Sequence, residues 1–121
     1  MRIKIDPADK KFSAYIRVRD DWTCQRCHKQ YVRGEAGIQN SHFWGRGKET
    51  TRFDPDNCDA LCFGCHQHFH SNPKEYHDWK LKQLGEEKFK LLEIKARTHG
   101  KKDRKLALII ATKLLQEELD K

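Results

Sequence analysis

The stretch LCFGCHQHFH, residues 61–70, sets the interpretation of the whole chain. It contains the pair Cys62 and Cys65, and a second Cys-x-x-Cys pair, Cys24 and Cys27, lies earlier in the sequence. Each Cys-x-x-Cys turn can present two thiolates at zinc-binding distance, and two such turns complete the tetrahedral ligand set of a structural Zn²⁺ ion. The sequence therefore predicts that the four cysteines hold one zinc ion, the alternative being four free or buried thiols.

The cellular compartment expected for this chain favours metal binding by the cysteines rather than disulfide formation. The N-terminus has no apolar signal segment, and the longest apolar run, residues 106–111, is too short to span a bilayer. We therefore expect an intracellular, cytoplasmic protein with no membrane partner, in which thiols stay reduced. The fifth cysteine, Cys58, lies outside both pairs and is interpreted as a small packed residue, although it could compete as a ligand.

Composition indicates one small domain with a thin core. Of the 121 residues, 36% are hydrophobic and 36% are charged, so burial alone is expected to leave little net stability. The composition therefore predicts that a bound metal ion supplies the rest. The chain has 25 Lys and Arg against 18 Asp and Glu, a formal charge of +7, which favours a polyanionic partner such as DNA or RNA. The alternative is a basic surface that is only solvated, and the charge alone does not distinguish this from nucleic-acid binding.

The sequence pattern predicts an α+β chain in two parts. Residues 1–73 should hold a first helix over about 7–19, short strands and turns from 24 to about 60, and a strand over 38–44. Helical periodicity begins at Leu61 and breaks at residues 71–73, where Asn72 can cap a new helix.

Residues 74–121 should form a helical C-terminal extension, packed on the core or used for dimerisation or DNA contact. One helix ends at Gly85, a second begins at Glu86, and a last one covers about 101–119. The last helix carries a broad apolar stripe: Leu106, Ile109, Ile110, Lys113, Leu114 and Leu115. The stripe is expected to be core, or else a face for a partner helix, as in a homodimer or an assembly factor.

Three histidines and an asparagine indicate a candidate catalytic site. His66 and His70 are one helical turn apart, so both imidazoles can hold one divalent ion with open positions. His42 ends an apolar stretch before a flexible basic loop, where a neutral imidazole could take a proton from water; alone, it would more often be an ordinary surface or packing histidine. Asn57 could brace that loop, or could be only a turn residue in residues 54–57.

Together these residues resemble the HNH motif of the ββα-metal endonucleases. The resemblance spans about residues 24–70 and implies a small zinc-stapled ββα-metal core preceded by an N-terminal helix. It implies that His42 is the general base, Asn57 the bracing residue and His66 a ligand of a catalytic divalent ion such as Mg²⁺, Mn²⁺ or Ni²⁺. Colicin-type members have a further ligand at the position of His70. The products implied are a 5′-phosphate and a 3′-hydroxyl.

One position departs from this motif. The residue before the base is usually Asp, Glu or His and ligates the metal, whereas this chain has Ser41, a weaker neutral ligand. Residues from about 41 to 92 also resemble the lambdoid phage recombination endonucleases called NinG or Rap, which likewise have Ser-His. The matching segments are Ser41-His42-Phe43, Arg52-Phe53-Asp54, Asp56-Asn57, Glu75-Tyr76 and Leu84-Gly85-Glu86. This resemblance implies a phage or prophage protein that acts on branched DNA.

The sequence therefore favours a divalent-metal-dependent DNA endonuclease. Arg46, Lys48 and Arg52 are expected to hold flanking phosphates. Phe43 and Trp44 could stack on an unpaired base, although packing in the strand core is the alternative. A non-catalytic zinc-stabilised module that binds nucleic acid or assembles with phage proteins is the competing interpretation.

Overall fold

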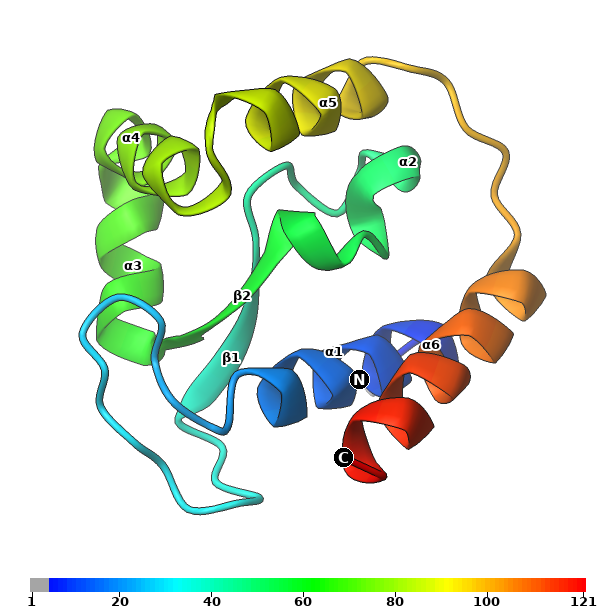
Figure 1. The fold of residues 1–121 in the computed structure, drawn as a ribbon, viewed down its shortest axis with the longest axis horizontal. Helices are drawn as coiled ribbons and strands as arrows, with labels where there is room; N and C mark the ends of the chain where they lie inside the picture. The colour runs from blue at the N-terminus through cyan, green and yellow to red at the C-terminus, as the bar shows by residue number, and fades with distance from the viewer. Residues whose placement is uncertain (1–4) are drawn as a thin grey trace, which may run out of the picture.

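The computed structural model describes residues 5–121, and in it helices surround a two-stranded hairpin (Figure 1). The hairpin runs through the middle of the molecule in Figure 1. In chain order the elements are α1 (Pro7–Arg19), β1 (Ile38–His42), α2 (Glu49–Arg52), the 3-10 helix η1 (Pro55–Asn57), β2 (Cys58–Cys62), α3 (Phe63–Ser71), α4 (Pro73–Leu84), α5 (Glu86–Ala96) and α6 (Arg104–Leu119).

The hairpin separates two helical faces. β1 and β2 are antiparallel, with Ser41 opposite Asp59, and all of β2 is buried. Neighbouring side chains of a strand point to opposite faces. Accordingly, Asn40 donates to the Ser13 hydroxyl of α1 (3.3 Å), whereas Gln39 bonds to His66 of α3 (2.6 Å). Helices α1 and α3 therefore lie against opposite faces of the same two strands.

Helix α1 forms where the sequence predicts it. Pro7 occupies the first turn, where its missing N–H costs no hydrogen bond, and the Asp6 carboxylate accepts from Ala8 N (2.8 Å). Phe12 and Ile16, one turn apart, are buried in the core below the hairpin. The predicted helix over residues 7–19 is confirmed.

Two boundaries near the hairpin differ from the sequence prediction. The helical pattern was expected from Leu61, but β2 continues to Cys62 because residues 60–62 pair with β1, and α3 starts only at Phe63. The strand expected over 38–44 ends at His42, because the backbone of Trp44 bonds to the Asn57 side chain instead of to a strand.

Two helix starts also differ. Asn72 makes no capping bond to α4; its side-chain amide donates to His68 O (2.8 Å) and so closes the end of α3. The last helix begins at Arg104 rather than near Lys101, because the Asp103 carboxylate accepts from Leu106 N (3.0 Å) and fixes the first turn.

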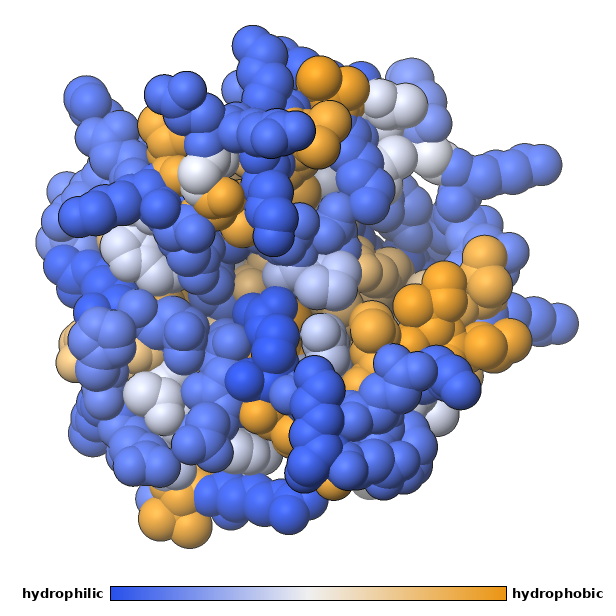
Figure 2. Space-filling model, viewed as in Figure 1, coloured by the Kyte–Doolittle hydropathy of each residue, from blue (hydrophilic) through white to orange (hydrophobic). Residues whose placement is uncertain are grey.

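The C-terminal helices pack around the hairpin. α5 contacts α4 and α2, and α6 returns to lie along α1, so the segment from residue 74 onward packs against the first part of the chain (Figure 1). The apolar stripe of α6 divides accordingly: Leu114 and Leu115 pack against the core, while Leu106, Ile109 and Ile110 are exposed. Figure 2 shows an apolar patch at the right of the molecule, on the side where α6 lies in Figure 1. Within residues 5–121, the helices lack the combination of length and apolarity that crossing a membrane requires.

Candidate functional site

The four paired cysteines converge on one point. The Sγ atoms of Cys24, Cys27, Cys62 and Cys65 all lie within 4.8 Å of one another, and those of Cys27 and Cys62 are 3.8 Å apart. Zinc–sulfur bonds of about 2.3 Å in a tetrahedron place the sulfurs about 3.8 Å apart. The cluster therefore fits a structural metal ion such as zinc, as the sequence predicts.

Local backbone geometry builds this cluster. In the first knuckle, Cys24 N donates to Lys29 O (2.9 Å) and His28, at a φ of 65°, donates to Cys24 O (2.8 Å), which closes a tight turn. In the second, the sulfur of Cys62 accepts from Cys65 N (3.4 Å) and caps α3. Burial alone would raise the pKa of Cys24, but hydrogen bonds from backbone N–H groups lower it to about 7, whereas burial raises the pKa of Cys65 to about 12. Cys24 is therefore the member of the cluster most ready to become a thiolate before an ion binds.

Cys58 belongs to the core. It is fully buried in β2 and lies outside the metal cluster, and burial raises the pKa of its thiol far above the usual value. A neutral, buried thiol of this kind behaves as a small apolar side chain. This agrees with the sequence interpretation of Cys58 as a packed residue.

His66 and His70 belong to α3: His66 directly follows Cys65 of the metal cluster, and His70 lies one turn further along the helix. His66 Nδ1 lies 2.6 Å from Gln39 Oε1, and because an amide oxygen can only accept, Nδ1 carries the proton and Nε2 keeps its lone pair. Partial burial and the nearby His70 lower the pKa of His66, so its imidazole is neutral near pH 7. A neutral histidine oriented through Nδ1 is the usual state of a histidine that ligates a metal through its other nitrogen.

His42 is held on the opposite side of the hairpin from His66. Its Nε2 lies 3.0 Å from Arg52 O, so Nε2 donates to this carbonyl and Nδ1 has the free lone pair. Burial is the main cause that lowers the pKa of His42, helped by the positive charge of Arg46, and the value falls to about 4. The imidazole is therefore neutral near pH 7, with its free lone pair on Nδ1.

This buried neutral histidine should make stability depend on pH. The unfolded chain binds a proton at His42 near pH 6.5, whereas the folded chain resists protonation until about pH 4. Stability is therefore lost as pH falls from about 6.5 towards 4. Between about pH 7 and about pH 5.5, we expect the free energy of unfolding to fall by roughly 1 kcal/mol less in His42→Gln than in wild type. Urea denaturation of both proteins at the two pH values measures this; parallel losses would contradict it.

Asn57 makes the contacts that a bracing residue requires. It is fully buried, its Oδ1 accepts from Trp44 N (2.7 Å), and its Nδ2 donates to Trp44 O and Thr51 O (3.0 Å each). Phe43 N also donates to Asn57 O (2.8 Å). The loop after His42 is thus tied to the segment before β2 by one amide side chain.

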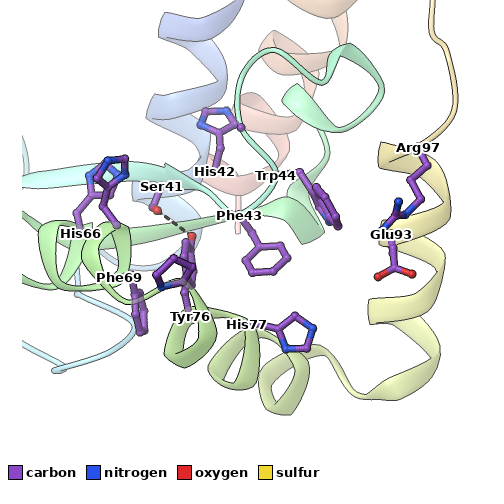
Figure 3. Close-up of a pocket in the computed structure, with 13 residues that line it drawn as sticks. Ser41, His42, Phe43, Trp44, His66, Phe69, Tyr76, His77, Glu93 and Arg97 are labelled. Carbon is purple, nitrogen blue, oxygen red and sulfur yellow. Dashed lines mark hydrogen bonds between the residues drawn. The ribbon is translucent and has the colours of Figure 1, made fainter.

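A pocket of about 600 Å³ is lined by four of the predicted site residues, Ser41, His42, His66 and His70. Figure 3 shows the ring of His42 pointing away from Phe43 and Tyr76. The Ser41 side chain, however, is buried, and its hydroxyl is 2.8 Å from the hydroxyl of Tyr76 on α4. Ser41 is therefore already engaged in a hydrogen bond at the position where related motifs carry a metal ligand. In residues 5–121, the only group of three or more Cys, His, Asp and Glu side chains close enough to hold an ion is the cysteine cluster.

Comparison with known families gives one match. The family described as Bacteriophage Lambda NinG protein matches residues 2–120, nearly the whole chain. The chain belongs to the NinG family. No curated protein and no solved structure shows a significant match. The match therefore places the chain in a phage family, while the chemistry of the pocket has to be inferred from its residues.

The basic residues expected to bind phosphates differ in their availability in this NinG-family chain. Arg52 is largely buried and forms an ion pair with Asp9 of α1, so its guanidinium is occupied by the protein. Arg46 also pairs with Asp9 (2.9 Å) but stays 58% exposed at its side chain, and Lys48 is exposed. Arg46 and Lys48 thus remain open to a polyanion, whereas Arg52 mainly fixes the loop whose carbonyl holds His42.

Sequence reasoning did not identify several residues that line the pocket or contact its histidines in this NinG-family chain. Gln39, which orients His66, could have been suspected from its position two residues before Ser41 on the same strand face. Tyr76, Glu93 and Arg97 come from α4 and α5, and no local pattern marks them as neighbours of the histidines. Their place depends on how the C-terminal helices pack.

Proposed function

We propose that this NinG-family protein is a divalent-metal-dependent DNA endonuclease of the HNH type. The observation that supports it most is that His42, His66 and His70 all line one pocket, His42 from the end of β1 where it also lines the neighbouring pocket at α1. Both His42 and His66 are neutral and oriented by hydrogen bonds. The basic excess of the chain favours a polyanionic substrate. Metal-assisted hydrolysis of a phosphodiester requires a general base and a bound divalent ion, and these residues could supply the base and two ligands for the ion.

In this proposal His42 is the general base. Its Nδ1 lone pair takes a proton from the attacking water while Nε2–H stays bonded to Arg52 O, which prevents the ring from turning. Asn57 acts through position, because it fixes the loop between His42 and Trp44. The pKa of His42, about 4, means that the base is unprotonated over the whole physiological range.

His66 and His70 would hold the catalytic ion, with water and phosphate oxygens as the remaining ligands. When bound, a divalent ion such as Mg²⁺, Mn²⁺ or Ni²⁺ stabilises negative charge on the scissile phosphate and the leaving oxygen. The bond from His66 Nδ1 to Gln39 fits this role because it leaves Nε2 available. Ser41 could contribute only if its hydroxyl exchanged Tyr76 for the ion.

The substrate proposed is DNA during phage recombination, including branched intermediates. Membership of a bacteriophage lambda family supports the phage context. Arg46 and Lys48 lie on the loop that follows His42, where they can contact phosphates beside the scissile bond.

A second candidate is a zinc-stabilised nucleic-acid-binding module without catalytic activity. The bond between Ser41 and Tyr76 favours it, because this bond occupies the hydroxyl that would have to complete a three-residue metal site. Zinc content and DNA affinity are expected of both candidates, so only cleavage can separate them.

The deciding experiment is cleavage by His42→Ala. We expect wild type to cut plasmid or four-way-junction DNA only with added Mg²⁺, Mn²⁺ or Ni²⁺, and His42→Ala to be slower by about a hundredfold or more, as loss of a general base predicts. His68→Ala is the matched control, because His68 lies on α3 but pairs with Glu75 outside the pocket. Gel assays with both variants, at unchanged zinc content, measure the effect. Equal rates for wild type and His42→Ala would sink the enzyme proposal.

A further inference from the structure

Two pockets of different character meet at His42. The larger, of about 600 Å³, has mainly aromatic walls: Phe43, Trp44, Phe69, Tyr76 and His77. The smaller, of about 370 Å³, is lined by charged side chains that include Lys10, Arg17, Arg46 and Asp9. His42 contributes to both. A DNA strand that passes His42 would therefore leave a charged surface and enter an aromatic one.

The aromatic walls are fixed before any ligand binds. Phe43 makes edge-to-face contacts with Tyr76 (5.0 Å between ring centroids) and Trp44 (5.7 Å). The backbone of Trp44 is held at both N and O by Asn57. Rigid aromatic faces that are ordered in advance lose little entropy when a flat ligand stacks on them.

The opposite wall is formed by α5 (Figure 3), where Glu93 and Arg97 line the pocket one helical turn apart. The Arg97 guanidinium lies 5.9 Å from the ring centroid of Trp44. Arg97 is exposed, and neither it nor Glu93 forms a salt bridge with any residue in the range 5–121. A guanidinium that lies over an indole and has no carboxylate partner can stack on a base and contact a phosphate.

We propose that the aromatic pocket binds one unpaired DNA base next to the scissile phosphate, stacked on Trp44 and contacted by Arg97. The adjoining charged pocket holds the backbone on the other side of His42. This inference rests on the proposed function for the identity of the ligand as DNA. A pocket volume of about 600 Å³ is within the range of about 300 to 1,000 Å³ that encloses small ligands. Stacking tolerates any base, so the pocket selects for an unpaired nucleotide rather than for a sequence.

The test uses the full-length protein and a duplex that carries one unpaired 2-aminopurine nucleotide at a flap, compared with the same duplex fully paired. Binding is measured without added divalent ions, by the fluorescence of the 2-aminopurine and by anisotropy of a labelled strand. Wild type should bind the flap about tenfold more tightly than the paired duplex and quench its fluorescence. Trp44→Ala and Arg97→Gln should lose most of this difference, while Trp44→Phe should keep part of it.

Lys90→Gln is the matched control for Arg97→Gln, because it removes one positive charge from an exposed site on α5 outside the pocket. It should weaken binding to both DNAs equally. If wild type, Trp44→Ala and Arg97→Gln, all folded with bound zinc, bind the flap and the paired duplex equally, the pocket proposal is wrong. Cleavage of the same DNAs with Mg²⁺ or Mn²⁺ tests the endonuclease proposal separately. Selective binding of the flap without cleavage would support the pocket proposal and contradict the endonuclease proposal. Cleavage without a preference for the flap would support the endonuclease proposal and contradict the pocket proposal.

Discussion

Cys27→Ala is expected to unfold much of the protein, although Cys27 is the exposed member of the metal cluster. A structural zinc ion contributes on the order of 10 kcal/mol to folding, which is comparable to the whole stability of a typical small domain. Loss of one thiolate separates the first knuckle from the second, and the second knuckle caps the helix that carries His66 and His70. Far-UV circular dichroism and zinc content of the purified variant measure the result.

Cys58→Ala provides the control. Cys58 is fully buried yet lies outside the cluster, so burial alone would predict that its replacement costs more than that of Cys27. We expect the reverse: only about 1 kcal/mol, for the small cavity left by the sulfur, with zinc content unchanged. Addition of a strong chelator should unfold wild type and Cys58→Ala alike. Equal stability of the two variants, or a fully folded chelated protein, would show that the cluster does not hold a structural metal.

The features that could be predicted from the sequence are those formed by residues close together in the chain. A Cys-x-x-Cys turn brings its own two sulfurs together, and residues four apart on a helix share a face, so the cysteine pairs and the pair His66 and His70 could be predicted without a fold. The start of α1 is equally local, because Asp6 and Pro7 fix its first turn. These features hold in the structure.

The remaining features depend on contacts between distant segments. The bond from Ser41 to Tyr76 joins residues that are 35 positions apart, and Arg52 reaches Asp9 over 43 positions. Both changed the interpretation of a predicted site residue, since each side chain already has a partner within the protein. The end of β2 was assigned to a helix because the strand is buried on both faces, Asp59 included, so its sequence lacks the two-residue alternation of apolar and polar residues that would separate a strand from a helix.

A buried ion pair joins α4 to β2. Lys80 is 1% exposed, and its ammonium donates to Asp59 (2.7 Å) and to Gln83 Oε1 (2.9 Å). Gln83 donates in turn to the same carboxylate. Asp59 is paired in register with Ser41, so this network fixes α4, and with it Tyr76, against the strand that carries the predicted site.

Lys80→Met is expected to destabilise the protein by about 3–5 kcal/mol, because it leaves the Asp59 carboxylate buried without a positive partner. Lys82→Met, an exposed lysine on the same helix, should change the free energy of unfolding by less than about 0.5 kcal/mol. The double variant Lys80→Met with Asp59→Leu should recover most of the loss, since a well-packed apolar pair can replace a buried ion pair. Urea denaturation of the three variants at constant zinc measures these differences. A cost of the single change no greater than that of Lys82→Met would contradict a stabilising role of this ion pair and would mean that α4 is held to the hairpin by its other contacts.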